Sequence, residues 1–147
     1  MSMFEQDYVL RMIQQLAQAI ARIAGFKKAG KLDEALSEVR ETADGIFGPL
    51  LRTLDAVDAQ SAAGLLGSRD KIEAYARLTA EEASIHDLRG DARRARSGER
   101  RALLLYLEAA ILGQVPSADA RAAIEALRRK VDEDQLPPRY REASAAL

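Results

Sequence analysis

The spacing of apolar residues constrains this fold more than any other feature of the sequence. Near the start of the chain, the regularly spaced apolar residues are Val9, Ile13, Leu16, Ile20 and Ile23. Steps of three and four residues place side chains on one face of an α-helix, whereas a half-buried strand needs strict alternation. We therefore predict a helix over residues 5–25 whose apolar face is buried against the rest of the chain.

Later segments repeat this helical period between glycine, proline and serine residues. The expected helices run from about residue 32 to a break at Gly48-Pro49, and over 69–88, 91–112 and 118–132. Ser68 and Ser117 are suited to cap two of them, because a serine hydroxyl accepts a hydrogen bond from an unpaired backbone N–H. β-branched residues, which favour strands, are few. The predicted fold is all-α, with antiparallel hairpins of about five to six helices in a single bundle.

The densest apolar run is ALLLYLEAAIL, at residues 102–112. A helix that is apolar on nearly every side is typical of one surrounded by other helices. The run contains Glu108 and is much shorter than the roughly 20 residues that a membrane span needs. We therefore place the centre of the core here and expect no contact with a membrane.

One domain is expected over residues 1–147, because no Pro/Gly-rich linker separates two apolar cores. Residues 55–68 are small and polar, and predict a hinge or irregular segment with at most a short helix ending at Gly67. The two prolines of Leu136-Pro137-Pro138 favour an extended stretch. From about residue 136 we expect a weakly ordered C-terminal tail.

Charge and cysteine content limit the classes of function. The chain has 22 basic and 23 acidic residues, a formal net charge of −1, and no cysteine. A net charge near zero provides no overall attraction to nucleic acid. The lack of cysteine excludes disulfides and thiolate chemistry, and fits a reducing compartment. Acidic residues near the start argue against a signal peptide, so we expect a cytoplasmic protein.

Two segments about 60 residues apart have related glycine and small-residue positions. The shared positions are Gly30-Lys31, Ala35 and Thr42 in the first segment, and Gly90-Asp91, Ala95 and Ala102 in the second. This pattern resembles the turn and second helix of a tetratricopeptide repeat, with Ala83 where that motif brings helices close together. The runs DYVLRMIQQL (7–16) and GKLDEAL (30–36) also resemble a bacterial family of small helical proteins known only as a domain of unknown function. The resemblance implies a tetratricopeptide-like fold and no particular activity.

Candidate catalytic and metal-binding residues are few. His86 is the only histidine, and Glu82 lies one helical turn before it. A Ser-His-Asp set or a zinc site would have to be built around this histidine, which we expect to be packed or hydrogen-bonded in its hairpin. A solvated acidic stripe is the better interpretation of Asp33, Glu34, Glu38 and Glu41. We therefore predict no catalytic residue, no metal and no cofactor, and hence no enzyme.

The most distinctive polar feature is a group of six arginines, Arg89, Arg93, Arg94, Arg96, Arg100 and Arg101. Four of them follow helical steps and so form one basic strip. Guanidinium groups bind carboxylates through paired hydrogen bonds, so the strip is a candidate surface for another protein or an acidic peptide. The alternative is that these arginines pair with acids on neighbouring helices. Nucleic acid is disfavoured, because no aromatic side chain is interleaved for base stacking.

These features favour a non-catalytic protein-protein interaction module, an adaptor or scaffold, that uses the groove between its hairpins or the arginine strip. Two alternatives stay open. An apolar face of the first helix would permit a structural homo-oligomer, and Phe4, Tyr8 and Met12 mark an apolar end of that helix. A pocket inside the bundle would permit small-ligand binding or enzymatic activity.

Overall fold

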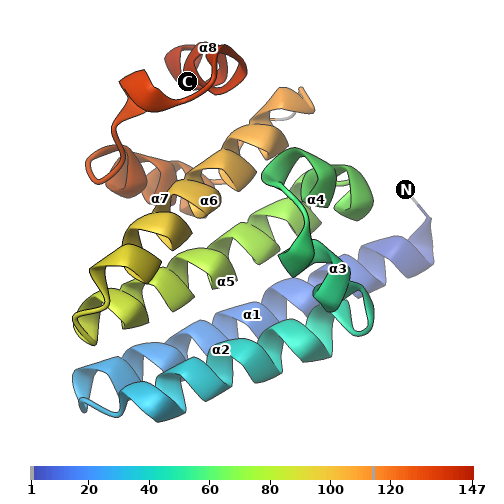
Figure 1. Cartoon of the computed structure of the whole chain (residues 1–147). Helices are drawn as coiled ribbons and strands as arrows, with labels where there is room; N and C mark the ends of the chain where they lie inside the picture. The colour runs from blue at the N-terminus through green and yellow to red at the C-terminus, as the bar shows by residue number, and fades with distance from the viewer. Residues whose placement is uncertain (1, 114) are drawn as a thin grey trace.

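The computed structural model describes residues 2–113 and 115–147, and every regular element in them is helical (Figure 1). The elements are α1 (Met3–Lys28), α2 (Leu32–Phe47), α3 (Leu50–Ala56), α4 (Ala59–Leu66), α5 (Arg69–Leu88), α6 (Ala92–Ile111), α7 (Ala118–Arg128), the 3-10 helix η1 (Glu133–Gln135) and α8 (Pro138–Ala145). The predicted all-α bundle is confirmed. The described residues hold eight α-helices instead of the expected five to six, and the short helices α3, α4 and α8 account for the difference.

Two long antiparallel hairpins, α1/α2 and α5/α6, make up most of the bundle (Figure 1). Both turn in the same way. Gly30 and Gly90 have φ angles of 72° and 80°, and the residue after each donates its N–H to the carbonyl five residues back. Glycine adopts this left-handed conformation without strain, and it therefore ends both first helices. The related glycine positions in the sequence correspond to one turn that is built twice.

The α5/α6 hairpin forms the centre of the core. All residues from Ala102 to Ala109 are buried, which confirms the predicted centre over this part of the apolar run, whereas Ile111 and Leu112 at its end are 37% and 51% exposed. The two helices approach closely at Gly98, where an added Cβ would lie 2.8 Å from the Cβ of Ala83. Phe47 of α2 packs edge to face on Tyr75 of α5, with 5.6 Å between the ring centroids. This aromatic contact joins the first hairpin to the second.

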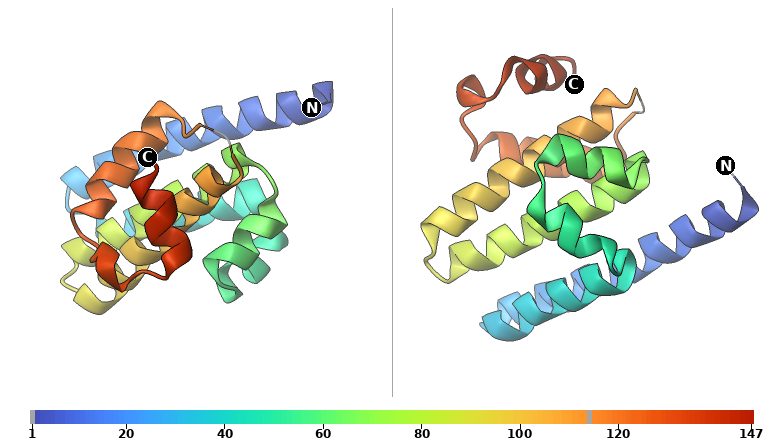
Figure 2. Two further views of the ribbon diagram at one scale, coloured as in Figure 1. Left: turned by 90° about the horizontal axis from the view of Figure 1, so that it is seen from above. Right: turned by 45° about the vertical axis from the view of Figure 1, so that its right-hand side comes forward.

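The buried face of α1 is rotated from the predicted one. Val9, Met12 and Ile23 are buried, but Ile13 is 45% exposed. The prediction that Ile13 faces the core is therefore wrong. The reason is that α1 packs mainly on α2 and α5, which cover less of its surface than its apolar residues occupy. The first turns of α1 also extend past the end of α2 (Figure 2).

Two short helices occupy the segment where the sequence predicts a break and a hinge. The break is at Gly48, whose φ is 55°, as predicted. Asp58 caps α4 by accepting a backbone N–H at 2.7 Å, and Gly67 ends α4 with a φ of 75°. Leu54 of α3 is fully buried, and α4 packs on α6. The segment is thus mostly helical and contributes to the core.

The C-terminal residues pack on α6 through α7 and α8 (Figure 1). Pro138 is the first residue of α8, where its missing N–H is not needed. Arg139 donates three hydrogen bonds of 2.6 to 3.1 Å to the carboxylate of Glu108 in α6, whose side chain is only 2% exposed. The sequence predicts a weakly ordered tail here, whereas residues 138–145 form a helix that an ion pair ties to the core.

Candidate interaction surfaces

The six arginines do not form one continuous free strip. Arg89, in the turn between α5 and α6, forms an ion pair with Asp33 in the first turn of α2. Arg96 pairs with Asp87 of α5 at 2.5 Å and with the buried carboxylate of Glu99 at 2.7 Å. The alternative that the sequence left open, pairing with acids inside the chain, therefore applies to these two arginines.

Arg101 lies on the side of α6 that faces α3. Its guanidinium donates to the backbone carbonyls of Leu54 and Val57 at 2.7 and 2.8 Å, and to the hydroxyl of Tyr75 at 3.1 Å. These carbonyls belong to the end of α3, where backbone acceptors lack helical partners. Tyr75 donates in turn to Asp55 at 2.7 Å. Burial, followed by this hydrogen bond, raises the pKa of Tyr75 to about 12. Arg101 therefore fastens α3 to the α5/α6 hairpin.

Arg93 and Arg100 are two exposed members of the strip. Within residues 2–113 and 115–147, no ion pair involves either of them, and Arg94 has only a 3.5 Å contact with Asp91 in the preceding turn. Two helical turns separate Arg93 from Arg100, a distance of about 10 Å along the helix axis. The predicted strip is reduced to a small basic surface on α6.

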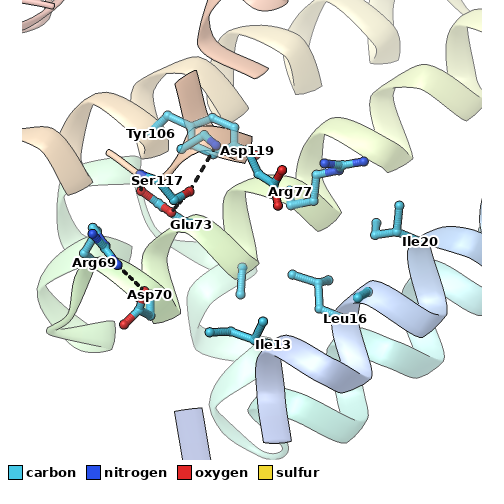
Figure 3. A pocket seen from close by; sticks show the side chains of 13 residues that line it. Ile13, Leu16, Ile20, Arg69, Asp70, Glu73, Arg77, Tyr106, Ser117 and Asp119 are labelled. Carbon is cyan, nitrogen blue, oxygen red and sulfur yellow. Dashed lines mark hydrogen bonds and ion pairs between the residues drawn. The ribbon is translucent and has the colours of Figure 1, made fainter. Parts of the chain in front are cut away.

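A groove between α1, α5 and α7 is the second candidate surface (Figure 3). The sequence predicts a groove between hairpins but not the residues that line it. The cavity has a volume of about 450 Å³. Its apolar wall belongs to α1 and consists of Ile13, Leu16, Ala17 and Ile20. This wall is the part of the apolar surface of α1 that α2 and α5 leave open.

The opposite wall is charged and comes from α5 and the start of α7 (Figure 3). Glu73 accepts hydrogen bonds from the hydroxyl and the N–H of Ser117, at 2.7 and 3.3 Å. Arg69 donates to Asp70 and to the carbonyl of Val115, both at 2.9 Å. These contacts tie the start of α7 to α5 and hold the charged side chains in place before anything binds.

Tyr106 of α6 also lines the groove. It is 3% exposed, and burial raises the pKa of its hydroxyl, so the group is a neutral phenol at ordinary pH. Arg77 is engaged by Glu81, one turn along α5, at 3.3 Å. The groove thus offers apolar contact on one side and fixed polar groups on the other, an arrangement suited to binding.

His86 is buried in the α5/α6 hairpin, 3.6 Å from the carboxylate of Glu82. The predicted packing of this histidine is confirmed. Among the residues that the structure describes, no three His, Asp or Glu side chains are grouped so that they could hold a metal ion. In the same residues, no helix is both long enough and apolar enough to cross a membrane.

Sequence reasoning placed Ile13, Leu16 and Ile20 on an apolar stripe but assigned them to the core. The signal that could have revealed the groove is the width of that stripe, since Ala17 and Ala24 extend it beyond what one neighbouring helix covers. Comparison of the chain with protein-family models, with curated proteins and with solved structures finds no match. The fold and its surfaces define an all-α bundle of helical hairpins with an open groove.

Proposed function

We propose that this protein is a non-catalytic interaction module, an adaptor or scaffold, that holds a segment of another protein in the groove between α1, α5 and α7. The observation that carries the proposal is an apolar wall, open at Ile13, beside a charged wall already held by hydrogen bonds. Apolar contact supplies binding free energy, and fixed polar groups orient the bound segment.

A helical segment suits this groove better than an extended one. An extended peptide leaves its backbone N–H and C=O groups unpaired, and it usually binds by adding to the edge of a sheet. The part of the chain in residues 2–113 and 115–147 contains no strand. A helix satisfies its own backbone and presents side chains at steps of three and four, which match the spacing of Ile13, Ala17 and Ile20 on α1.

The tetratricopeptide-like arrangement, the bacterial origin and the cytoplasmic location belong to the same proposal. Support for the arrangement comes from the identical turns at Gly30 and Gly90. Support for a reducing compartment comes from the lack of cysteine. Nucleic acid remains a disfavoured partner, because Arg89, Arg96 and Arg101 are engaged by acids or carbonyls of this chain.

A second surface for an acidic peptide is the exposed pair Arg93 and Arg100 on α6. Guanidinium groups that form no ion pair among the described residues are suited to bind carboxylates of a partner. Ile13 of the groove lies on α1 and the arginine pair lies on α6, so substitutions can separate the contributions of the two surfaces.

The test is affinity purification from the source cells with mass spectrometry, using four forms of the full chain. These are the wild type, Ile13→Glu in the groove, an Arg93→Glu/Arg100→Glu variant, and the control Leu88→Glu. Leu88 is 55% exposed and lies at the end of α5 away from the groove, so it matches the chemistry of the Ile13 change. We expect Ile13→Glu to lose partners that Leu88→Glu retains. If only the arginine variant loses partners, the binding site lies on α6. If all four forms recover the same partners, both surfaces are rejected.

A further inference from the structure

The first turns of α1 carry three strongly exposed apolar side chains. Met3 is 77% exposed, Phe4 is 86% exposed and Leu10 is 58% exposed. The first turn of α1, which carries Met3 and Phe4, extends past the end of α2 (Figure 2). Leu10 follows Tyr8, whose hydroxyl donates a hydrogen bond to the carbonyl of Ile46 near the end of α2, so Leu10 lies beside α2 but points to solvent. Apolar side chains that gather on a surface in this way are typical of a protein interface.

Two opposite charges lie close to these apolar residues along α1. Asp7 and Arg11 are one helical turn apart, and both are exposed. Arg11 donates from Nε to the backbone carbonyl of Asp7 at 3.4 Å, not to its carboxylate. In the described residues, neither side chain takes part in an ion pair. The segment therefore presents an acid and a base at a fixed spacing, with apolar residues on both flanks.

We propose that this end of α1 pairs with the same segment of a second copy of the chain, antiparallel and around a two-fold axis at the level of Val9. Residues equally distant from Val9 then face each other across the axis, so Asp7 of each copy lies opposite Arg11 of the other. A two-fold interface repeats each contact, and one pairing therefore makes two ion pairs. Phe4 of each copy lies over the aliphatic part of Gln14 of the other.

Charge selects this register and orientation. A parallel pair in register would set Asp7 against Asp7 and Arg11 against Arg11, and like charges in contact oppose association. In the antiparallel pair centred on Val9, each Asp7 instead faces an Arg11, and both contacts are attractive. The apolar side chains of Met3, Phe4 and Leu10 then lose water contact at the flanks, which supplies the favourable free energy.

The expected dimer is weak and reversible. A stable interface buries about 1,600 Å² in total, and a contact between two short helical segments covers less than that. The pairing does not rest on the proposed function, because Ile13 lies about a third of a turn away from the face that carries Asp7 and Arg11. If the groove were found to bind no partner, the dimer would still be expected. If the chain were found to be monomeric, the groove could still bind a partner.

The test is sedimentation equilibrium of the full chain over a wide range of concentration. The wild type should shift from monomer to dimer as concentration rises. Asp7→Arg and Arg11→Asp should each weaken the dimer about tenfold, because each reversal turns two attractive pairs into two repulsive ones. The double variant Asp7→Arg/Arg11→Asp should recover the affinity of the wild type.

Two controls complete the design. Glu34→Arg changes the charge of an exposed residue on α2 and should leave the association unchanged, whereas Phe4→Ala should weaken it. All four substituted residues are exposed, and circular dichroism will verify the folding of the five variants. A wild type that stays monomeric at the highest soluble concentration overturns the proposal. A dimer that both single reversals leave intact, or that the double variant fails to restore, overturns the antiparallel register.

Discussion

The two long hairpins share one turn but have opposite roles in the molecule. Gly30 and Gly90 end their helices with the same left-handed conformation and the same backbone hydrogen bond. The α5/α6 hairpin is covered by α2, α4, α7 and α8, and its second helix is buried from Ala102 to Ala109. The α1/α2 hairpin lies at one edge, and α1 leaves Leu10 and Ile13 exposed. The turn makes the two helices of each hairpin antiparallel. Whether the apolar residues of a hairpin form a core or an exposed surface depends on how many neighbouring helices cover them.

The largest expected difference between the hairpins is the cost of removing a leucine. Leu107 of α6 is fully buried, whereas Leu10 of α1 is 58% exposed. Leu107→Ala should lower the free energy of unfolding by about 2 to 5 kcal/mol, through lost burial and a residual cavity. Leu10→Ala should change it by no more than about 0.5 kcal/mol. Urea unfolding followed by circular dichroism measures both, and equal values for the two variants would contradict the contrast.

The second largest expected difference is in the free energy of unfolding lost when two adjacent arginines of α6 are replaced. Arg101→Ala removes the donors that hold the Leu54 and Val57 carbonyls of α3, and should cost about 1.5 to 3 kcal/mol. Arg100→Ala, its matched neighbour, should stay within about 0.5 kcal/mol because this side chain is exposed. Urea unfolding of both variants tests the assignment of Arg101 to structure. If the Arg101→Ala variant were as stable as the wild type but lost binding partners, Arg101 would belong to the interaction surface instead.

Local chemistry explains which parts of this contrast were predictable. Gly90 and Ser68 mark helix ends through their own backbone or hydroxyl, so the ends of α5 followed from the sequence. The partners of Arg101 lie 44 and 47 residues away, and no spacing pattern records such a contact. The exposure of Ile13 likewise depends on which helices cover α1. Elements were therefore predictable from the sequence, whereas the groove and the paired arginines required the tertiary arrangement.

Glycines inside the second helix of each hairpin offer a smaller test with opposite signs. An added Cβ at Gly98 of α6 would lie 2.8 Å from the Cβ of Ala83, so Gly98→Ala should cost about 1 to 3 kcal/mol through overpacking. At Gly45 of α2 the nearest atom is the amide nitrogen of Gln15, 3.1 Å away on a flexible side chain. Gly45→Ala should therefore stabilise the fold, by up to about 1 kcal/mol, through helix propensity. Thermal melts of the two variants should move in opposite directions, and two losses of similar size would show that both hairpins are packed equally tightly.

The smallest expected effect appears only in alkaline solution and again concerns the α5/α6 hairpin. Burial raises the pKa of Tyr75 to about 12 and raises that of Tyr106 as well, whereas an unfolded tyrosine titrates near 10. Above pH 10 the unfolded chain loses these protons while the folded chain keeps them, so the unfolded state binds fewer protons. Stability should then fall as pH rises from 10 to about 12, and the contribution of both groups is complete below pH 10. Urea unfolding at several pH values measures this slope. Tyr106→Phe should reduce it, because Phe has no proton to lose, and a slope unchanged by that substitution would place the alkaline sensitivity outside the core of this hairpin.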